Sequence, residues 1–144
     1  MAIKKAYLKQ IKGVSFVGKT DSNIWIPMDG PAEFGGSSAG IKPKELLLLA
    51  LAGCTSFDVV TILQKKRAVL EDYEIYVEAE MAEEHPQVFT KIHIEYVFYG
   101  DNLKEEDIKQ AIELSQTKYC SVTKMLEKVC EITHSYSIKQ KNKN

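Results

Sequence analysis

The sequence predicts an α+β fold, because strand-like and helix-like segments are grouped along the chain instead of alternating one by one. Their order is short strands, one apolar helix, a hairpin, two helices and a last strand. The length of 144 residues and the 44% share of hydrophobic residues suit one globular domain with a substantial core. We therefore expect residues 1–144 to form a single domain.

The N-terminal third is expected to hold short strands followed by a long loop. Residues 3–26 mix β-branched and aromatic residues with lysines, and Gly13 and Gly18 mark turns. Residues 28–43, MDGPAEFGGSSAGIKP, consist largely of small residues and proline. Long loops in compact domains are often functional.

A helix is predicted from Lys44 to about Lys66. Pro43 lacks the N–H that a first helical residue leaves unpaired, and Glu45 complements the positive end of the helix dipole. The residues are apolar all round as far as Val60, so we expect other elements to enclose most of this helix.

Two alternating segments follow. In YEIYVEAEM, residues 73–81, apolar side chains alternate with glutamates, and VFTKIHIEYVFYG, residues 88–100, has a similar pattern. Alternation of this kind is typical of strands with one buried face. The pair predicts an antiparallel hairpin.

Two helices and a strand complete the chain. Asn102 and Glu105 form a plausible capping pair for a helix whose apolar stripe ends near Tyr119, and a second short helix follows directly. CEITHSYSI, residues 130–138, alternates again and predicts a strand.

Composition excludes several classes of protein. A formal net charge of -1 gives no reason to expect nucleic acid or anionic lipid as a partner. The N-terminus lacks the apolar core of an export signal, and no later segment approaches the roughly 20 apolar residues that span a bilayer. We expect a cytoplasmic protein. Three cysteines in a reducing compartment argue against a disulfide framework.

The cysteines differ in their surroundings. Cys54 follows the run LLLLALAG, and a buried free cysteine most often behaves as a small hydrophobe, so an inert core thiol is the simpler interpretation. Cys120 lies between two predicted helices, where Ser121 can cap the second. The unpaired N–H groups there would lower the pKa of the Cys120 thiol. Alternatively, this position could present Cys120 as a disulfide partner. Cys130 lies on the apolar face of the last strand, and we expect it in the core.

Other site motifs are absent from the sequence. The histidines and cysteines show no CxxC or HxxxH spacing, so we predict no metal site. GGSSAG lacks the spacing of a phosphate-binding loop, and we interpret it as a flexible loop. We therefore expect no cofactor.

Two segments together resemble a known family. GG followed by GIKPKELLLLALAGCTSFDVVTILQKKR, and later KYCSV before an amphipathic helix, are similar to the OsmC/Ohr family of osmotically induced and organic hydroperoxide resistance proteins. The likeness covers nearly the whole chain. It implies an intertwined homodimer, with antiparallel sheets wrapped around long central helices.

The resemblance also implies a reaction. The cysteine matching Cys54 attacks the O–O bond of an organic hydroperoxide and becomes a sulfenic acid, and the one matching Cys120 resolves it to a disulfide that an external dithiol reduces. An apolar pocket would select the substrate and limit over-oxidation of the thiol. We expect Gly36, Leu51 and Phe57 to line it together with Tyr119.

The chain departs from the family at the residues that support the thiolate. Better-known members use an arginine from the early loop and a glutamate ten positions before the cysteine, whereas here Arg67 is the first arginine and Lys44 occupies that position. Lys42 or Lys44 could supply the charge. Glu45 lies roughly 13 Å along the helix from Cys54, so we expect it to act through an intermediary or from the partner subunit. The match is to a divergent OsmC-like branch.

Three hypotheses follow from the sequence. The first is a thiol-dependent peroxidase for organic hydroperoxides, which uses Cys54 and Cys120 in defence against oxidative or osmotic stress. The second is a non-catalytic dimer that binds a small apolar ligand at the subunit interface. The third is a redox sensor or structural dimer.

Overall fold

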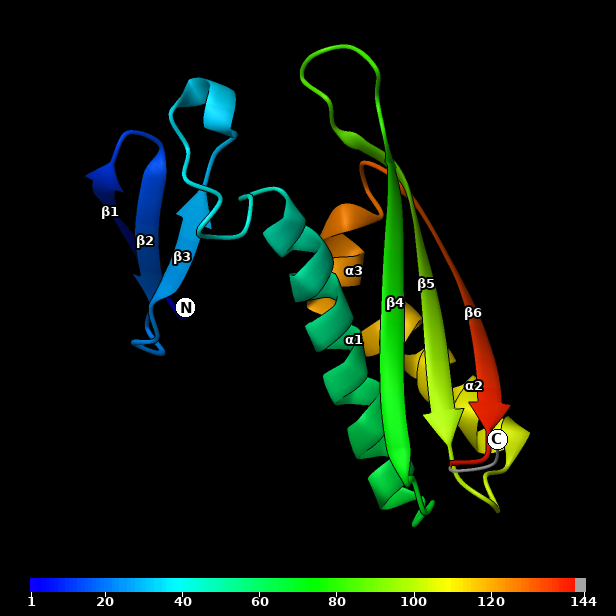
Figure 1. Ribbon diagram of the computed structural model, residues 1–144. Coiled ribbons are helices and arrows are strands. Elements are labelled where there is room, and N and C mark those ends of the chain that lie inside the picture. The colour runs from blue at the N-terminus through cyan, green and yellow to red at the C-terminus, as the bar shows by residue number, and fades with distance from the viewer. Residues whose placement is uncertain (142–144) are drawn as a thin grey trace. The chain divides into compact units, whose positions relative to one another are not determined.

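The computed structural model describes residues 1–141, and the chain divides into two compact units that meet between Leu47 and Leu48 (Figure 1). The predicted α+β class is confirmed by two three-stranded sheets and one long helix.

The N-terminal unit contains an antiparallel sheet in the order β1-β2-β3. Its strands are β1 (Ala6–Lys12), β2 (Ser15–Thr20) and β3 (Ile26–Asp29). Gly13 forms the first turn with a φ of +56°, a left-handed conformation that favours glycine. Gly18 was expected at a turn but lies within β2, paired with Leu8 and Ile26.

The predicted loop after β3 is organised by the buried carboxylate of Asp29. It accepts hydrogen bonds from the hydroxyl of Ser37 (2.5 Å) and from the backbone N–H groups of Ser37 (3.0 Å) and Ala39 (3.2 Å). The Ser37 hydroxyl contributes most to lowering the pKa of Asp29 to about 2. The small-residue loop is therefore a folded turn anchored on one carboxylate, and it includes the short 3-10 helix η1 (Ala32–Phe34).

The C-terminal unit contains the second sheet, in the order β4-β5-β6. β4 (Asp72–Met81) and β5 (Phe89–Tyr99) form the predicted antiparallel hairpin. β6 (Glu131–Lys139) pairs with β5 in parallel, with Ile92 opposite Ile132. The expectation of sheets that are antiparallel throughout is therefore wrong for this pair. A parallel pair needs a crossover connection, and the two helices between β5 and β6 supply it.

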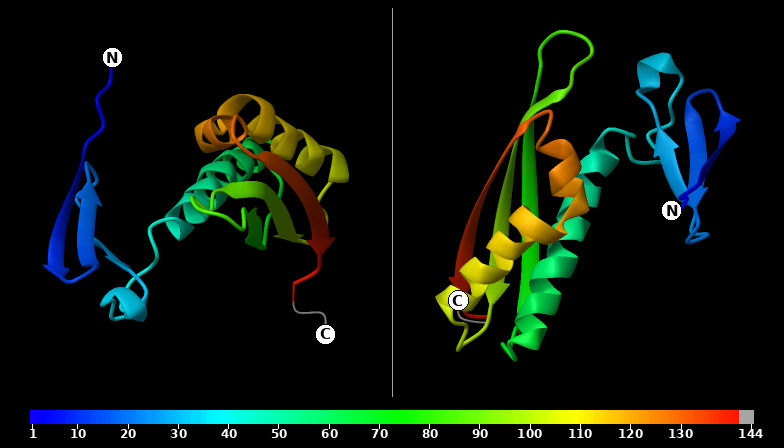
Figure 2. Two further views of the ribbon diagram at one scale, coloured as in Figure 1. Left: turned by 90° about the horizontal axis from the view of Figure 1, so that it is seen from above. Right: turned by 180° about the vertical axis from the view of Figure 1, so that it is seen from behind.

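The long helix α1 (Glu45–Lys65) matches its predicted range and packs on one face of this sheet. Figure 2 shows α2 (Glu105–Leu114) and α3 (Ser121–Leu126) on that same face. The core lies between the helices and β5. Its largest buried side chains are Leu51, Val59, Leu63, Ile92, Ile94, Tyr96, Phe98, Ile108 and Ile112.

Only one stripe of α1 is buried within a single chain, namely Leu51, Thr55, Val59 and Leu63. The expectation that other elements enclose the helix is therefore not met by this chain alone. Successive buried positions are four residues apart, which follows one side of a helix. The opposite side carries exposed apolar residues, among them Leu49 and Phe57.

By length and composition, α1 would be able to cross a membrane, with 21 residues and a mean hydropathy of 2.1 over its most apolar window. The expectation that no segment would reach this limit is wrong. Core helices of soluble proteins pass the same test, so it is weak evidence for a membrane span. A polar cluster also crosses the middle of this helix, where Thr55 bonds to Tyr96 and Ser115.

The helical region after β5 is more segmented than predicted. α2 begins at Glu105 with Lys104 as N-cap in place of the expected Asn102, and among residues 1–141 no side chain caps it by a hydrogen bond. It continues into a π-helical turn, η2 (Ser115–Tyr119), before α3. Cys120 separates η2 from α3.

Candidate active site

Cys54 lies in the middle of α1, half-buried and packed against the core. Its neighbour Thr55 belongs to the buried stripe of the helix, whereas Phe57 is exposed. Cys54 therefore occupies the border between the buried and exposed sides of α1.

Cys120 is fully buried and is itself the N-cap of α3. Its Sγ accepts a hydrogen bond from the backbone N–H of Thr123 at 3.4 Å. The sequence predicted Ser121 as the cap. The structure moves the cap back by one residue because the π-helical turn ends with the Cys120 N–H bonded to the Ser115 carbonyl (2.8 Å), and Cys120 leaves it in an extended conformation.

The two sulfurs are neighbours in one chain. The Cys120 thiol donates a hydrogen bond to the Cys54 sulfur, and the Ser121 hydroxyl lies 3.9 Å from Cys54 Sγ. Both cysteines are free thiols. This arrangement brings α1 and the start of α3 together, and it allows a disulfide to form without a long-range rearrangement.

The surroundings favour the thiolate at Cys54. Burial alone would raise the pKa of this thiol, but hydrogen bonds from the Val122 N–H, the Cys120 thiol and the Ser121 hydroxyl outweigh it. The pKa of Cys54 is consequently below its ordinary value, although the nearby charge of Asp58 opposes the shift. Neutral donors at the start of α3 thus supply the compensation that burial requires.

Cys120 behaves in the opposite way. Burial raises its pKa, and the neighbouring Cys54 sulfur adds to the effect, while the hydrogen bonds from Thr123 only partly counteract it. The expectation that the pKa of Cys120 would fall is wrong. The local N–H groups do lower a thiol pKa, but the one that benefits is Cys54.

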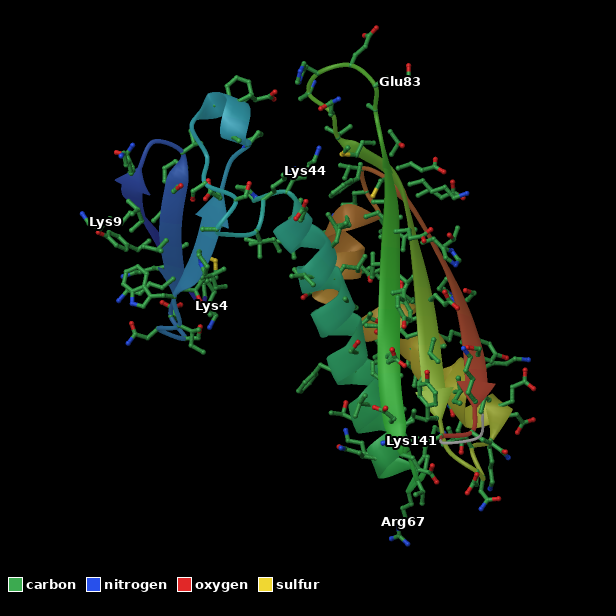
Figure 3. The ribbon with its side chains drawn as sticks, viewed as in Figure 1. Lys4, Lys9, Lys44, Arg67, Glu83 and Lys141 are labelled. Atoms are coloured by element: carbon green, nitrogen blue, oxygen red, sulfur yellow. The ribbon has the colours of Figure 1, made fainter. Side chains whose placement is uncertain are left out.

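The residues predicted to support the thiolate, Lys42, Lys44 and Glu45, belong to the N-terminal unit. There, Glu45 is the first residue of α1, and its N–H donates to the Lys42 carbonyl at 3.0 Å. Their action on Cys54 stays a prediction. Arg67 lies at the C-terminal end of α1 (Figure 3), about 20 Å along the helix from Cys54.

The four predicted pocket residues are placed differently. Phe57 and Tyr119 line a common cavity of about 440 Å³ with Ile62 and Leu114. Leu51 is fully buried in the core. Gly36 belongs to the N-terminal unit, where an added Cβ would lie 1.8 Å from the Gly30 carbonyl oxygen, so only glycine fits. Their role in substrate binding stays a prediction.

Sequence reasoning did not identify several residues near the thiols. Val122 and Ser121 act as donors to Cys54, and a buried polar cluster joins Thr55, Tyr96 and Gln116. The sequence feature that could have indicated the cluster is the polar run SQT at residues 115–117, which interrupts the apolar stripe of the predicted helix. Within residues 1–141, no group of three or more potential metal ligands is placed to hold an ion.

Comparison with known proteins agrees with this architecture. The family model "OsmC-like protein" matches residues 35–135. Protein YhfA of Escherichia coli strain K12 is 41% identical over 134 residues, which cover 93% of this chain and 97% of that protein. The crystal structure of a hypothetical protein from Aquifex aeolicus VF5 is 32% identical, with a TM-score of 0.86 over 99% of this chain and 100% of that one.

A more distant structure has the same fold. An organic hydroperoxide resistance protein OsmC from Legionella pneumophila superposes with a TM-score of 0.68 at 14% identity, over 95% of this chain and 98% of that one. The family model covers well over half of the chain, and the predicted resemblance is confirmed. The chain belongs to the family of OsmC-like proteins.

Proposed function

We propose that the protein is a thiol-dependent peroxidase that reduces organic hydroperoxides in the cytoplasm, as part of a defence against peroxide stress. The observation that carries this proposal is the thiol pair itself. Cys54 is half-buried and stabilised as a thiolate, and Cys120 donates a hydrogen bond directly to it. A nucleophilic thiol beside a second thiol is the arrangement that a two-cysteine peroxidase requires.

The reaction proceeds in two steps. The Cys54 thiolate attacks one oxygen of the O–O bond; an S–O bond forms, the O–O bond breaks, and the alkoxide leaves as an alcohol after it takes up a proton. The Cys120 sulfur then attacks the resulting sulfenic acid. The S–S bond forms, the S–O bond breaks, and the hydroxyl group takes up the proton of the Cys120 thiol and leaves as water. An external dithiol returns two electrons and two protons to the disulfide.

The family and the surface of the chain support the remaining parts of the proposal. The Legionella pneumophila relative is described as an organic hydroperoxide resistance protein, and the cavity beside Phe57 and Tyr119 offers Ile62 and Leu114 to an alkyl group among polar lining residues. Exposed apolar residues on α1 support a homodimer. The family model crosses the boundary between the two units, which supports a single OsmC-like domain.

Thiol counting tests the proposal. Reduced protein treated with cumene hydroperoxide is expected to lose two thiols, with a Cys54–Cys120 bridge found by peptide mapping. Cys54→Ser abolishes this oxidation. Cys130→Ser is the matched control, since that thiol is buried and bonded to the Leu126 carbonyl (3.3 Å). Loss of no thiol, or oxidation of Cys130 instead, would contradict the peroxidase.

A second candidate function rests on a different observation. A cavity of about 400 Å³ in the N-terminal unit is lined largely by apolar residues, including Ile24, Ile26 and Met28. A non-catalytic protein that binds a small apolar ligand would use such a cavity. Unchanged ligand affinity in Cys54→Ser, together with no peroxide consumption by the unmodified protein, is the result that favours this alternative.

A further inference from the structure

The segment that presents Cys120 is held by the side chain of Gln116. This residue lies in the π-helical turn η2, four positions before Cys120. Its amide nitrogen donates to Thr55 Oγ1 (3.1 Å) and Tyr96 Oη (2.9 Å), and its amide oxygen accepts from Thr123 Oγ1 (3.4 Å). One amide therefore joins α1, β5, η2 and α3.

The anchor of this amide is rigid. Thr55 and Tyr96 are both fully buried, and their hydroxyl oxygens are 2.6 Å apart. Ser115 adds a second connection from η2, since its hydroxyl lies 2.8 Å from Thr55 Oγ1 and donates to Asp58 (2.9 Å). Buried polar groups that are all hydrogen-bonded specify one arrangement, because leaving one unpaired costs about 1–3 kcal/mol.

The connection brackets Cys120 on both sides. Gln116 precedes it, and Thr123, which Gln116 contacts, follows it in the first turn of α3. The backbone N–H of the same Thr123 donates to Cys120 Sγ. Any drift of η2 away from the Thr55–Tyr96 pair would therefore also move the sulfur.

We propose that Gln116 is a positioning residue that holds Cys120 in place for attack on oxidised Cys54. This inference rests on the proposed two-cysteine chemistry and assigns Gln116 to its second step. Gln116 contacts neither sulfur by a hydrogen bond that the described residues show. Its removal should therefore leave peroxide attack by Cys54 unchanged and slow only the formation of the S–S bond.

The matched variant is Gln116→Met, which keeps the length of the side chain and removes its hydrogen bonds. Thr55 and Tyr96 remain bonded to each other, so the core keeps its polar pairing. Thr123→Val is a second variant, which removes the hydroxyl that donates to Gln116 together with its hydrogen bond to the Cys120 sulfur and keeps the backbone N–H bond. Gln64→Met, at an exposed position of α1, is the control.

The rate at which Cys120 closes the disulfide with Cys54 can be measured without peroxide. Reaction of Cys54 with dithionitrobenzoate forms a mixed disulfide and releases one thionitrobenzoate; attack by Cys120 then forms the protein disulfide and releases a second. We expect the second release to be at least about tenfold slower in Gln116→Met, since small misplacements of reacting groups are costly. Thr123→Val should be slowed in the same direction, and Gln64→Met should match the unmodified protein.

A parallel measurement uses cumene hydroperoxide and traps the sulfenic acid with dimedone. Gln116→Met should form sulfenic acid at the unmodified rate but accumulate more of the dimedone adduct. Gln116→Glu should restore part of the closure rate, because the hydroxyls of Thr55, Tyr96 and Thr123 can donate to a carboxylate. Partial recovery of this kind is not expected if the residue only fills space.

The outcomes separate the two claims. If Gln116→Met releases the second thionitrobenzoate at the rate of the unmodified protein, the positioning role is overturned, whatever the result with cumene hydroperoxide. A protein that releases the second thionitrobenzoate but never reacts with hydroperoxide contradicts the peroxidase and leaves the measured role of Gln116 in disulfide closure intact. Slowing in Gln64→Met equal to that in Gln116→Met also overturns the inference.

Discussion

The pKa of Cys54 is lowered without a nearby arginine of its own helix. The donors on the described part of the chain are the Val122 N–H, the Cys120 thiol and the Ser121 hydroxyl. Hydrogen bonds to a charged group are worth about 1.5–3 kcal/mol, roughly twice a neutral pair. Several such donors can therefore offset the burial of one sulfur, which explains how the pKa of Cys54 is lowered in a chain that has lysines in the early loop.

Replacement of Ser121 tests this balance. Ser121→Ala removes one donor and should raise the pKa of Cys54, so that less thiolate is present at pH 7. A single long hydrogen bond corresponds to about a two- to fivefold slower alkylation by iodoacetamide at that pH. The measurement is the pH profile of alkylation at Cys54 with Cys120 and Cys130 replaced by serine. Ser135→Ala on β6 is the control, and identical profiles for both variants would rule out the role of Ser121.

At the scale of elements, the sequence predicts what depends on local pattern. The alternation of 73–81 and 88–100 correctly predicts β4 and β5, because a period of two places every second side chain on the buried face. The range of α1 is likewise close, since Pro43 and the basic end of the helix are local signals. These features can be read without knowledge of the rest of the fold.

Features that depend on pairing were not predictable in the same way. The alternating pattern of residues 130–138 does not indicate whether that strand runs parallel or antiparallel to β5. The π-helical turn arises where Ser115 and Gln116 bond to Thr55, which is distant in the sequence. The direction of the pKa shift at Cys120 depends in turn on Cys54 being its neighbour. The sequence therefore predicts the two cysteines of the candidate site, whereas the hydrogen-bond donors to Cys54 are identified only from the structure.

The end of α1 offers a test of element stability. Arg67 has a φ of +60°, the Arg67 N–H bonds to the Gln64 carbonyl, and the Ala68 N–H bonds to the Leu63 carbonyl. This is the helix-ending motif in which glycine is preferred. Arg67→Gly should stabilise the protein by about 0.5–1 kcal/mol, measured by urea unfolding. Arg67→Ala loses the same charge but keeps the left-handed conformation, so it should give no gain; equal stabilisation by both would show that charge, not conformation, is responsible.

At the scale of the whole molecule, the exposed apolar surface is the feature one chain leaves unexplained. α1 buries one stripe and exposes Leu47, Leu49 and Phe57, and β1 exposes Tyr7 and Leu8. Each unit thus exposes apolar side chains of its own, and large exposed apolar patches mark interaction sites in soluble proteins. A second copy of the chain is the partner that the family resemblance predicts, and burial of the exposed side of α1 would then complete the enclosure that its sequence indicates.

The final prediction follows from that surface. The protein should sediment at twice the 16.3 kDa of one chain, and Leu49→Lys, at a position that is 59% exposed, should shift it toward the monomer. Burial of a leucine is worth about 1.5–3 kcal/mol, and a twofold-symmetric interface contains it twice, so the dissociation constant should rise at least about a hundredfold.

Leu49→Met keeps the apolar contact and should remain dimeric, and Tyr76→Lys, on β4, should do so as well. Sedimentation equilibrium over a range of concentrations distinguishes these results, and an unmodified protein that is monomeric throughout would contradict the dimer.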